Sequence, residues 1–166
     1  ARSGAIVTGA RMFLVAYNVN LSTNDVKVAS EIALRIRESG RTMKDHLGNA
    51  MKVPGALKSV KAMGVALERF NIAQVSINLT NFHVTPPHVA FEEVRKEAEK
   101  LGFTVTGSEI VGLVPKEALL IAGRFFAGSA AAGANEDELI GKAIAGLGLS
   151  NLETFDPAKK IIDSMI

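Results

Sequence analysis

The stretch from Ala73 to Thr80 reads AQVSINLT, in which apolar and polar residues alternate. Side chains two positions apart in a strand lie on the same face, so this period predicts a strand with one apolar and one polar face. The polar row carries amides and hydroxyls and no charged group, and its members are Gln74, Ser76, Asn78 and Thr80. The segment therefore predicts a sheet with one face packed on a core and one face open.

Three further segments predict strands. Met12–Leu21 is apolar with β-branched and aromatic residues, and Leu57–Glu68 and Phe103–Val114 are the other two segments expected to form strands. Gly64, inside the second of these segments, indicates either a bulge or the close approach of another backbone. In contrast, Arg41–Pro54 mixes basic residues with Asn, Gly and Met in no regular period, and this predicts a mobile loop.

Helices are expected between and after these strands because capping residues precede apolar residues at helical spacing. Their expected ranges are Thr23 or Asn24 to about Ser39, Thr85-Pro86-Pro87 to Leu101, Pro115 to about Ala127, Glu136 to Leu147, and a short helix capped by Asp156. The first six elements follow the order strand, helix, strand, strand, helix, strand. This is the split β-α-β-β-α-β order of ferredoxin-like domains, so we expect a single α+β domain over residues 1–166 with extra C-terminal helices.

In that topology the first and third strands are neighbours in the middle of the sheet, and both helices cover one face. Asn18 and Asn20 of the first strand would then lie beside the polar row of Ala73–Thr80. Such a patch suits a heterocycle or an amide ligand, because each Asn or Gln offers donors and an acceptor. A solvated sheet face without a ligand is the alternative interpretation. RNA-recognition modules of the same strand order carry aromatic residues on the central strands, so we expect no nucleic-acid partner.

Composition excludes several classes of site. The 166 residues include no cysteine, so disulfides, Cys-ligated metals and thiol nucleophiles are excluded. His83 and His88 flank a Pro-Pro pair and match no metal-binding motif, so we expect no metal. The apolar stretch Ala118–Ala134 is interrupted by Arg124 and is too short to span a membrane.

Charge is distributed unevenly along a chain whose formal net charge is only +2. Between Arg35 and Lys61 there are seven basic and two acidic residues, a local net charge of +5. This segment could attract a polyanionic substrate, although a solvated helix end with a flexible loop is the alternative.

Four motifs together resemble the C-terminal subdomain of glutamate formiminotransferase, which in animals is the first module of formiminotransferase-cyclodeaminase. They are GARMFLVAYNVNL at Gly9–Leu21, IRESGR at Ile36–Arg41, QVSINL at Gln74–Leu79 and GSEIVGLVP at Gly107–Pro115. The resemblance continues in order over nearly the whole chain, to the Phe155–Ile166 segment.

This resemblance implies a cytoplasmic, folate-dependent transferase of histidine degradation. Such an enzyme moves a formimino group from formiminoglutamate to a ring nitrogen of tetrahydrofolate. The family's transferase module places two ferredoxin-like subdomains side by side, with folate in a positively charged cleft between them, and a homodimer is expected. The catalytic His of the family belongs to the N-terminal subdomain, and none of His46, His83 or His88 matches its motif, so no catalytic residue is assigned to this chain.

The resemblance and the shared strand face together predict this half of the folate and formiminoglutamate cleft. Its expected residues are Arg11, Asn18, Asn20, Gln74, Ser76, Asn78 and Glu109. Arg11 should make the strongest contact, a charge-assisted hydrogen bond to a glutamate carboxylate. The segment Arg35–Lys61 could attract the additional glutamates that folates commonly carry. Under this hypothesis the chain is active only with its N-terminal partner, in cis or in trans. The alternative is a non-catalytic ferredoxin-like module that binds folate or an amino acid, or that dimerises.

Overall fold

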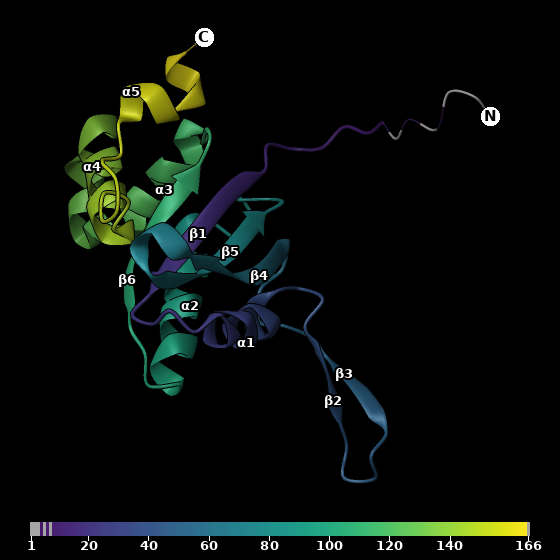
Figure 1. Cartoon of the computed structure of the whole chain (residues 1–166). Coiled ribbons are helices and arrows are strands. Elements are labelled where there is room, and N and C mark those ends of the chain that lie inside the picture. Colours follow the sequence, from purple (N-terminus) through teal and green to yellow (C-terminus); the bar gives the residue numbers. More distant parts are fainter. Residues whose placement is uncertain (1–3, 5, 7, 166) are drawn as a thin grey trace.

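A four-stranded antiparallel sheet forms the centre of the computed structural model, which describes Gly4, Ile6 and residues 8–165 (Figure 1). Its strand order is β4-β5-β1-β6. The strands are β1 (Val15–Leu21), β4 (Val60–Leu67), β5 (Ile72–Leu79) and β6 (Val105–Val111). The predicted first and third strands, β1 and β5, are neighbours in the middle of the sheet. The ferredoxin-like prediction is therefore confirmed.

Two helices, α1 (Val26–Ile36) and α2 (Pro87–Lys100), cover one face of this sheet and build the core with it. The apolar rows of the central strands and of α1 are fully buried there, as expected from their periods. This core includes Tyr17, Leu21, Ile32, Ile36 and Leu79. Because successive side chains alternate between faces, the polar rows of β1 and β5 lie on the opposite face.

The helix starts differ from the sequence prediction at two caps. Asp25, not Thr23 or Asn24, caps α1, and its side chain accepts a hydrogen bond from the Lys27 backbone N–H at 2.8 Å. Thr85 does not cap α2, since Pro86 is its N-cap residue and no side chain caps the helix, while the Thr85 hydroxyl donates to the Lys58 carbonyl at 2.6 Å. The N-cap therefore lies one or two residues later than expected at α1 and one residue later at α2.

Three further helices follow β6: α3 (Lys116–Ala127), α4 (Glu136–Leu147) and α5 (Pro157–Lys160). A capping box between Asn135 and Glu138 begins α4, and Gly148 in the left-handed conformation ends it. The Asp156 side chain caps α5, as predicted. Short 3₁₀ segments complete the chain at Glu68–Phe70, Gly128–Gly133 and Ile162–Ser164.

The prediction of a mobile loop over Arg41–Pro54 is wrong. This segment forms a hairpin of β2 (Arg41–Lys44) and β3 (Ala50–Val53), which projects away from the main sheet (Figure 1). Asp45 fixes its turn by accepting the backbone N–H groups of Leu47 and Asn49, both at 2.8 Å. The strands carry no alternation of apolar and polar residues because both faces of the hairpin are exposed, so periodicity could not reveal them.

Gly64 marks the close approach of a helix and not a bulge. A Cβ atom at this position would overlap the backbone nitrogen of Ser30 in α1. The pairing of β4 with β5 continues without a register shift from Val60 to Leu67. The glycine therefore lets α1 lie directly against β4.

Candidate functional site

The strand register brings residues from three strands together on the face opposite α1 and α2. Asn18 of β1 lies opposite Ser76 of β5 and also opposite Glu109 of β6. Asn20 lies opposite Gln74 of β5 in the same way. Side chains on directly paired residues share one face of a sheet, so segments 91 residues apart contribute to one surface.

Four of these residues form a hydrogen-bonded polar cluster, defined here as Asn18, Asn20, Gln74 and Glu109. Gln74 Nε2 donates to Asn20 Oδ1 at 2.7 Å and to Glu109 Oε1 at 3.2 Å. Asn18 Nδ2 donates to Glu109 Oε1 at 2.8 Å and approaches Gln74 Oε1 at 3.5 Å. The side chains are thus held in fixed orientations before any ligand arrives. Two donors share one oxygen of Glu109, and in the described part of the chain no protein donor bonds its Oε2.

One end of the polar cluster is closed to solvent and the other end is open. Asn20 is fully buried and Gln74 is 2% exposed, whereas Asn18 and Glu109 are half-buried. Within the described residues Asn20 Nδ2 has no hydrogen-bond acceptor. A buried donor without an acceptor costs about 1–3 kcal/mol, so this atom is a preferred contact for a ligand or water oxygen that reaches the cluster.

A cover segment, residues 149–155, closes the buried end. The side chain of Asn151 donates to the Thr106 carbonyl, and Glu153 forms an ion pair with Arg69 at 3.0 Å. Thr106 belongs to β6, at one edge of the sheet, and Arg69 belongs to the connection between β4 and β5, near the other edge. The cover segment therefore contacts both ends of the strand order. Asn151 also lies over Gly107, which is the residue opposite Asn20 in β6. A Cβ atom at Gly107 would overlap the side chain of Asn151.

The remaining predicted site residues lie outside the polar cluster. Ser76 is half-buried on the same face, and Asn78 is exposed on that face opposite Ala16. Arg11 precedes β1, in a segment without regular secondary structure (residues 8–14). Its side chain is exposed and its hydrogen bond in the structure goes to the neighbouring Met12 carbonyl, at 3.4 Å. The structure therefore unites four of the seven predicted residues in one network and leaves Arg11 apart from it.

None of the three histidines contacts the polar cluster in the described residues. His46 lies in the turn of the β2–β3 hairpin, and His83 follows β5 with its Nε2 atom 3.8 Å from a carboxylate oxygen of Glu117. His88 begins α2 on the helical side and stacks on Phe125 with ring centroids 4.5 Å apart.

Burial lowers the pKa of His88, and the charge of Glu92 opposes this shift only in part. The folded state therefore binds this proton less readily than the unfolded chain. Stability from this site is present above the ordinary histidine pKa of about 6.5 and is lost as the pH falls below it. As the pH is lowered from about 7 to about 5, we expect the free energy of unfolding of His88→Phe to decrease less than that of the wild type. Urea unfolding at each pH measures this difference. His46→Phe is the control, and an equal pH response in wild type and His88→Phe would contradict the prediction.

Sequence patterns did not reveal a second polar contact, which lies on the helical side of the sheet. The Tyr17 hydroxyl donates to Ser108 Oγ at 2.9 Å, and Ser108 Oγ donates to the Leu147 carbonyl at 2.6 Å. Burial raises the pKa of Tyr17, so its hydroxyl remains a neutral donor. These bonds tie β1 and β6 to the end of α4, directly behind the polar cluster.

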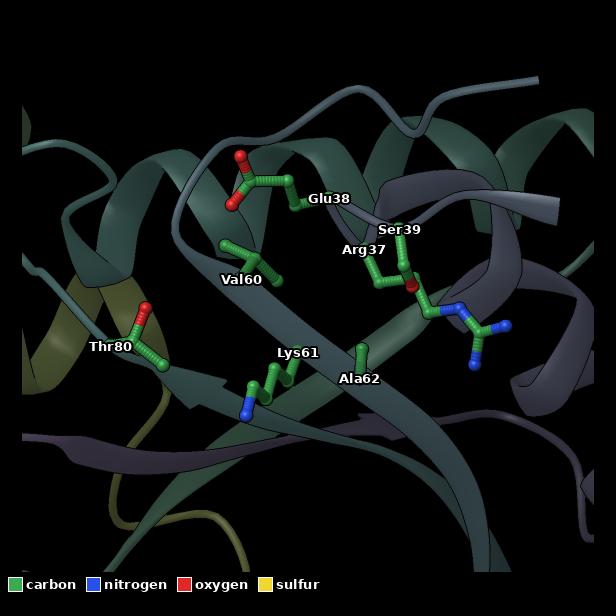
Figure 2. Close-up of a pocket in the computed structure, with 7 residues that line it drawn as sticks. All are labelled: Arg37, Glu38, Ser39, Val60, Lys61, Ala62 and Thr80. Carbon is green, nitrogen blue, oxygen red and sulfur yellow. The ribbon is translucent and has the colours of Figure 1, made fainter. Parts of the chain in front are cut away.

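A cavity of about 460 Å³ lies at the outer edge of β4, beside the end of α1 (Figure 2). Its lining is Arg37, Glu38, Ser39, Val60, Lys61, Ala62 and Thr80. In Figure 2 the Arg37 guanidinium and the Lys61 ammonium point to different sides of β4. Neither cation forms an ion pair with the described residues, and Arg37 Nε donates to the Gly40 carbonyl at 3.0 Å.

Two negative findings concern the described residues alone. No helix among them is long and apolar enough to cross a membrane. No three of their His, Asp or Glu side chains are grouped in a way that could hold a metal ion.

Comparison with known proteins assigns the chain to a family. The sequence model of the formiminotransferase domain matches residues 16–166. This chain belongs to the formiminotransferase family. The match contains the whole polar cluster and the cover segment, whereas Arg11 lies before it.

Several curated formimidoyltransferases are similar to this family member. It is 45% identical to the formimidoyltransferase-cyclodeaminase of Mus musculus and 44% identical to that of Dictyostelium discoideum, in each case over 98% of this chain and 29% of the relative. It is 41% identical to the glutamate formimidoyltransferase of Thermoplasma acidophilum, over 75% of this chain and 37% of the relative. The matched part of this formiminotransferase chain thus corresponds to between 29% and 37% of the length of these relatives.

Proposed function

We propose that this chain is the folate-binding half of a glutamate formimidoyltransferase. The reaction transfers a formimino group from N-formimino-L-glutamate to tetrahydrofolate in histidine degradation. A ring nitrogen of tetrahydrofolate forms a bond to the formimino carbon and gives up its proton, the bond from that carbon to the glutamate nitrogen breaks, and the released amine takes up a proton. The observation that carries the proposal is the polar cluster on the open sheet face of a formiminotransferase-family chain.

The chemistry of the polar cluster supports a heterocyclic ligand. Asn18 and Glu109 are half-buried at its open end, and their mutual hydrogen bond fixes the directions in which they can bind. A pterin ring carries adjacent N–H donors and a carbonyl acceptor, which match the free oxygen of Glu109 and the amides beside it. Because the side chains are already oriented, little conformational entropy is lost when such a ring binds.

The catalytic base, in this proposal, comes from an N-terminal subdomain that is joined to this chain or supplied as a separate polypeptide. The described histidines support this view, since none of them contacts the polar cluster. The experiment is a transferase assay of the chain alone and after addition of that subdomain, with tetrahydrofolate binding measured in parallel by calorimetry. We expect binding without turnover for the chain alone and turnover after addition. Turnover by the chain alone would contradict the assignment of the base, and binding without turnover in both samples would favour the non-catalytic module.

Arg11 and Asn78 are expected to contribute to substrate affinity although they lie outside the polar cluster. In the complete transferase, Arg11→Ala removes a charge-assisted hydrogen bond of about 1.5–3 kcal/mol, which corresponds to a 10- to 150-fold rise in a Michaelis constant. Asn78→Ala should produce a smaller rise, because a neutral hydrogen bond contributes about 1 kcal/mol. Steady-state kinetics with each substrate varied in turn measure both effects. Unchanged constants and turnover in both variants would remove these residues from the site.

The cavity with Arg37 and Lys61 is a candidate site for the additional glutamates of a folate tail. Each glutamate adds a carboxylate, and attraction between exposed charges decreases as salt screens them. We expect the affinity for a polyglutamyl folate to decrease with salt more steeply than the affinity for the monoglutamate, as measured by titration at several ionic strengths. Equal salt dependence for the two ligands would contradict this role.

A further inference from the structure

Ser108 lies directly before Glu109 in β6, and its side chain is on the opposite, helical side of the sheet. It is 1% exposed, and it is hydrogen-bonded through both its side chain and its backbone. Its Oγ atom donates to the Leu147 carbonyl at 2.6 Å and accepts the Tyr17 hydroxyl at 2.9 Å. Its N–H donates to the Gly148 carbonyl at 3.1 Å. Ser108 therefore joins β1 and β6 to the end of α4.

The contact between β6 and the end of α4 leaves little space for movement. A Cβ atom at Gly148 would lie 2.9 Å from the Cα atom of Gly107, so the two backbones are in direct contact. On the open face, the side chain of Asn151 donates to the Thr106 carbonyl. This part of β6 is thus held by α4 and by the cover segment, and Glu109 is the residue that follows it.

The hydroxyl pair and the polar cluster connect the same two strands from opposite faces. On the helical side, the hydroxyls of Tyr17 and Ser108 connect β1 to β6. On the open side, the next residues along these strands, Asn18 and Glu109, are connected at 2.8 Å. Glu109 Oε1 also accepts Gln74 Nε2 at 3.2 Å, a long bond that a small shift of β6 would break. The orientation of the polar cluster therefore depends on where β6 lies relative to β1 and β5.

We propose that Ser108 is a positioning residue of the polar cluster, which holds Glu109 in its ligand-binding orientation, with Tyr17 as the supporting donor. Without the Ser108 hydroxyl, the Tyr17 hydroxyl and the Leu147 carbonyl both lose this partner in a buried environment. An unpaired buried polar group is costly, so β6 shifts until these groups find new partners. That shift moves Glu109 away from Gln74. The role rests on the proposed function for the identity of the ligand, but the geometry of the polar cluster does not.

Gln74 gives a direct signal for the position of Glu109, because it is the single glutamine of the chain. Glutamine with an NMR-active nitrogen in its side chain labels this amide alone, with one proton bonded to Glu109 and the other to Asn20. In the ligand-free chain, we expect Ser108→Ala to shift the first proton signal toward that of a solvated amide and to leave the second in place. Tyr17→Phe should shift it less, because the bond from Ser108 to α4 remains.

Thr85→Val is the matched control for the loss of a buried hydroxyl. Thr85 is 3% exposed, and its hydroxyl also donates to a backbone carbonyl at 2.6 Å, that of Lys58. This bond lies before α2 and outside the polar cluster, so both Gln74 signals should remain unchanged in this variant. Unchanged Gln74 signals in Ser108→Ala, or an equal shift in Thr85→Val, would overturn the proposal.

Calorimetry with tetrahydrofolate measures the consequence for binding. Ser108→Ala should weaken the affinity at least about tenfold, and Thr85→Val should remain within about twofold of wild type. In the Glu109→Ala background, Ser108→Ala should have no further effect, because the side chain that it positions is absent. Wild-type affinity of Ser108→Ala, or an equal loss with and without Glu109, would contradict the positioning role. Absence of binding in the wild type would count against the proposed function alone, since the Gln74 signals are measured without ligand.

Discussion

Replacing Gln74 by methionine in the complete transferase is expected to lower kcat/KM for formimidoyl transfer by about 100-fold. Methionine has a similar length and keeps the buried volume, but it cannot replace the bonds of Gln74 to Asn20 and Glu109. Glu109 then keeps one of its two protein donors and can rotate away from its position in the polar cluster. Loss of hydrogen bonds that involve a charged group costs about 1.5–3 kcal/mol, and 2.7 kcal/mol corresponds to two orders of magnitude in rate.

The matched control is Asn24→Ala, which removes an exposed amide pair between Asn24 and Asn71 at 3.0 Å, outside the polar cluster. Its kcat/KM should remain within about twofold of wild type, because an exposed hydrogen bond is readily replaced by water. Urea unfolding of both variants separates loss of function from loss of folding. If Gln74→Met folds and retains wild-type kinetics, the polar cluster does not orient the substrates.

Gly123→Val is expected to reduce stability by at least about 4 kcal/mol. Gly123 lies in α3 where this helix meets α4, and a Cβ atom there would overlap the backbone carbonyl of Leu139. A helix backbone cannot yield as a flexible side chain can, so the two helices must separate. Their separation exposes or loosens the buried side chains of Leu119 and Leu147.

Gly141→Ala, in the same pair of helices, is expected to increase stability. Gly141 lies inside α4, and a Cβ atom there meets open space. Alanine should therefore stabilise the helix by about 0.5–1 kcal/mol. Urea unfolding of both variants measures the two changes, and a mild effect of Gly123→Val would show that α3 and α4 can move apart at low cost.

The sequence predicted those parts of the fold in which a period or a cap determines the local structure. The alternation of Ala73–Thr80 correctly indicated the polar face of β5, and the order of elements indicated the neighbouring positions of β1 and β5. The same face carries Asn18, Asn20 and Gln74, so most of the polar cluster was predictable. Glu109 entered the prediction through its motif, and its contact with Asn18 depends on a register that no local pattern specifies.

Contacts between distant segments account for what the sequence could not predict. Pro86 occupies the N-cap of α2, and the hydroxyl of Thr85 instead bonds a carbonyl 27 residues earlier. The burial of Asn20 accompanies closure by the cover segment, which is more than 120 residues away and carries no recognisable motif. For Arg11 the motif gave a prediction that the structure does not reproduce. Its side chain was expected in the site because it belongs to a matching motif, but it does not lie in the polar cluster.

Tyr17 provides an intrinsic fluorescence signal for this protein. It is the single tyrosine of a chain without tryptophan, so all tyrosine fluorescence comes from one buried ring. Its neighbour Asn18 belongs to the polar cluster on the other side of β1, and its bonding partner Ser108 precedes Glu109 of the same cluster. Emission from this ring therefore reports on the same strands that hold the proposed folate site, without any added label. The low ultraviolet absorbance of the protein also leaves the absorption of a bound pterin directly visible.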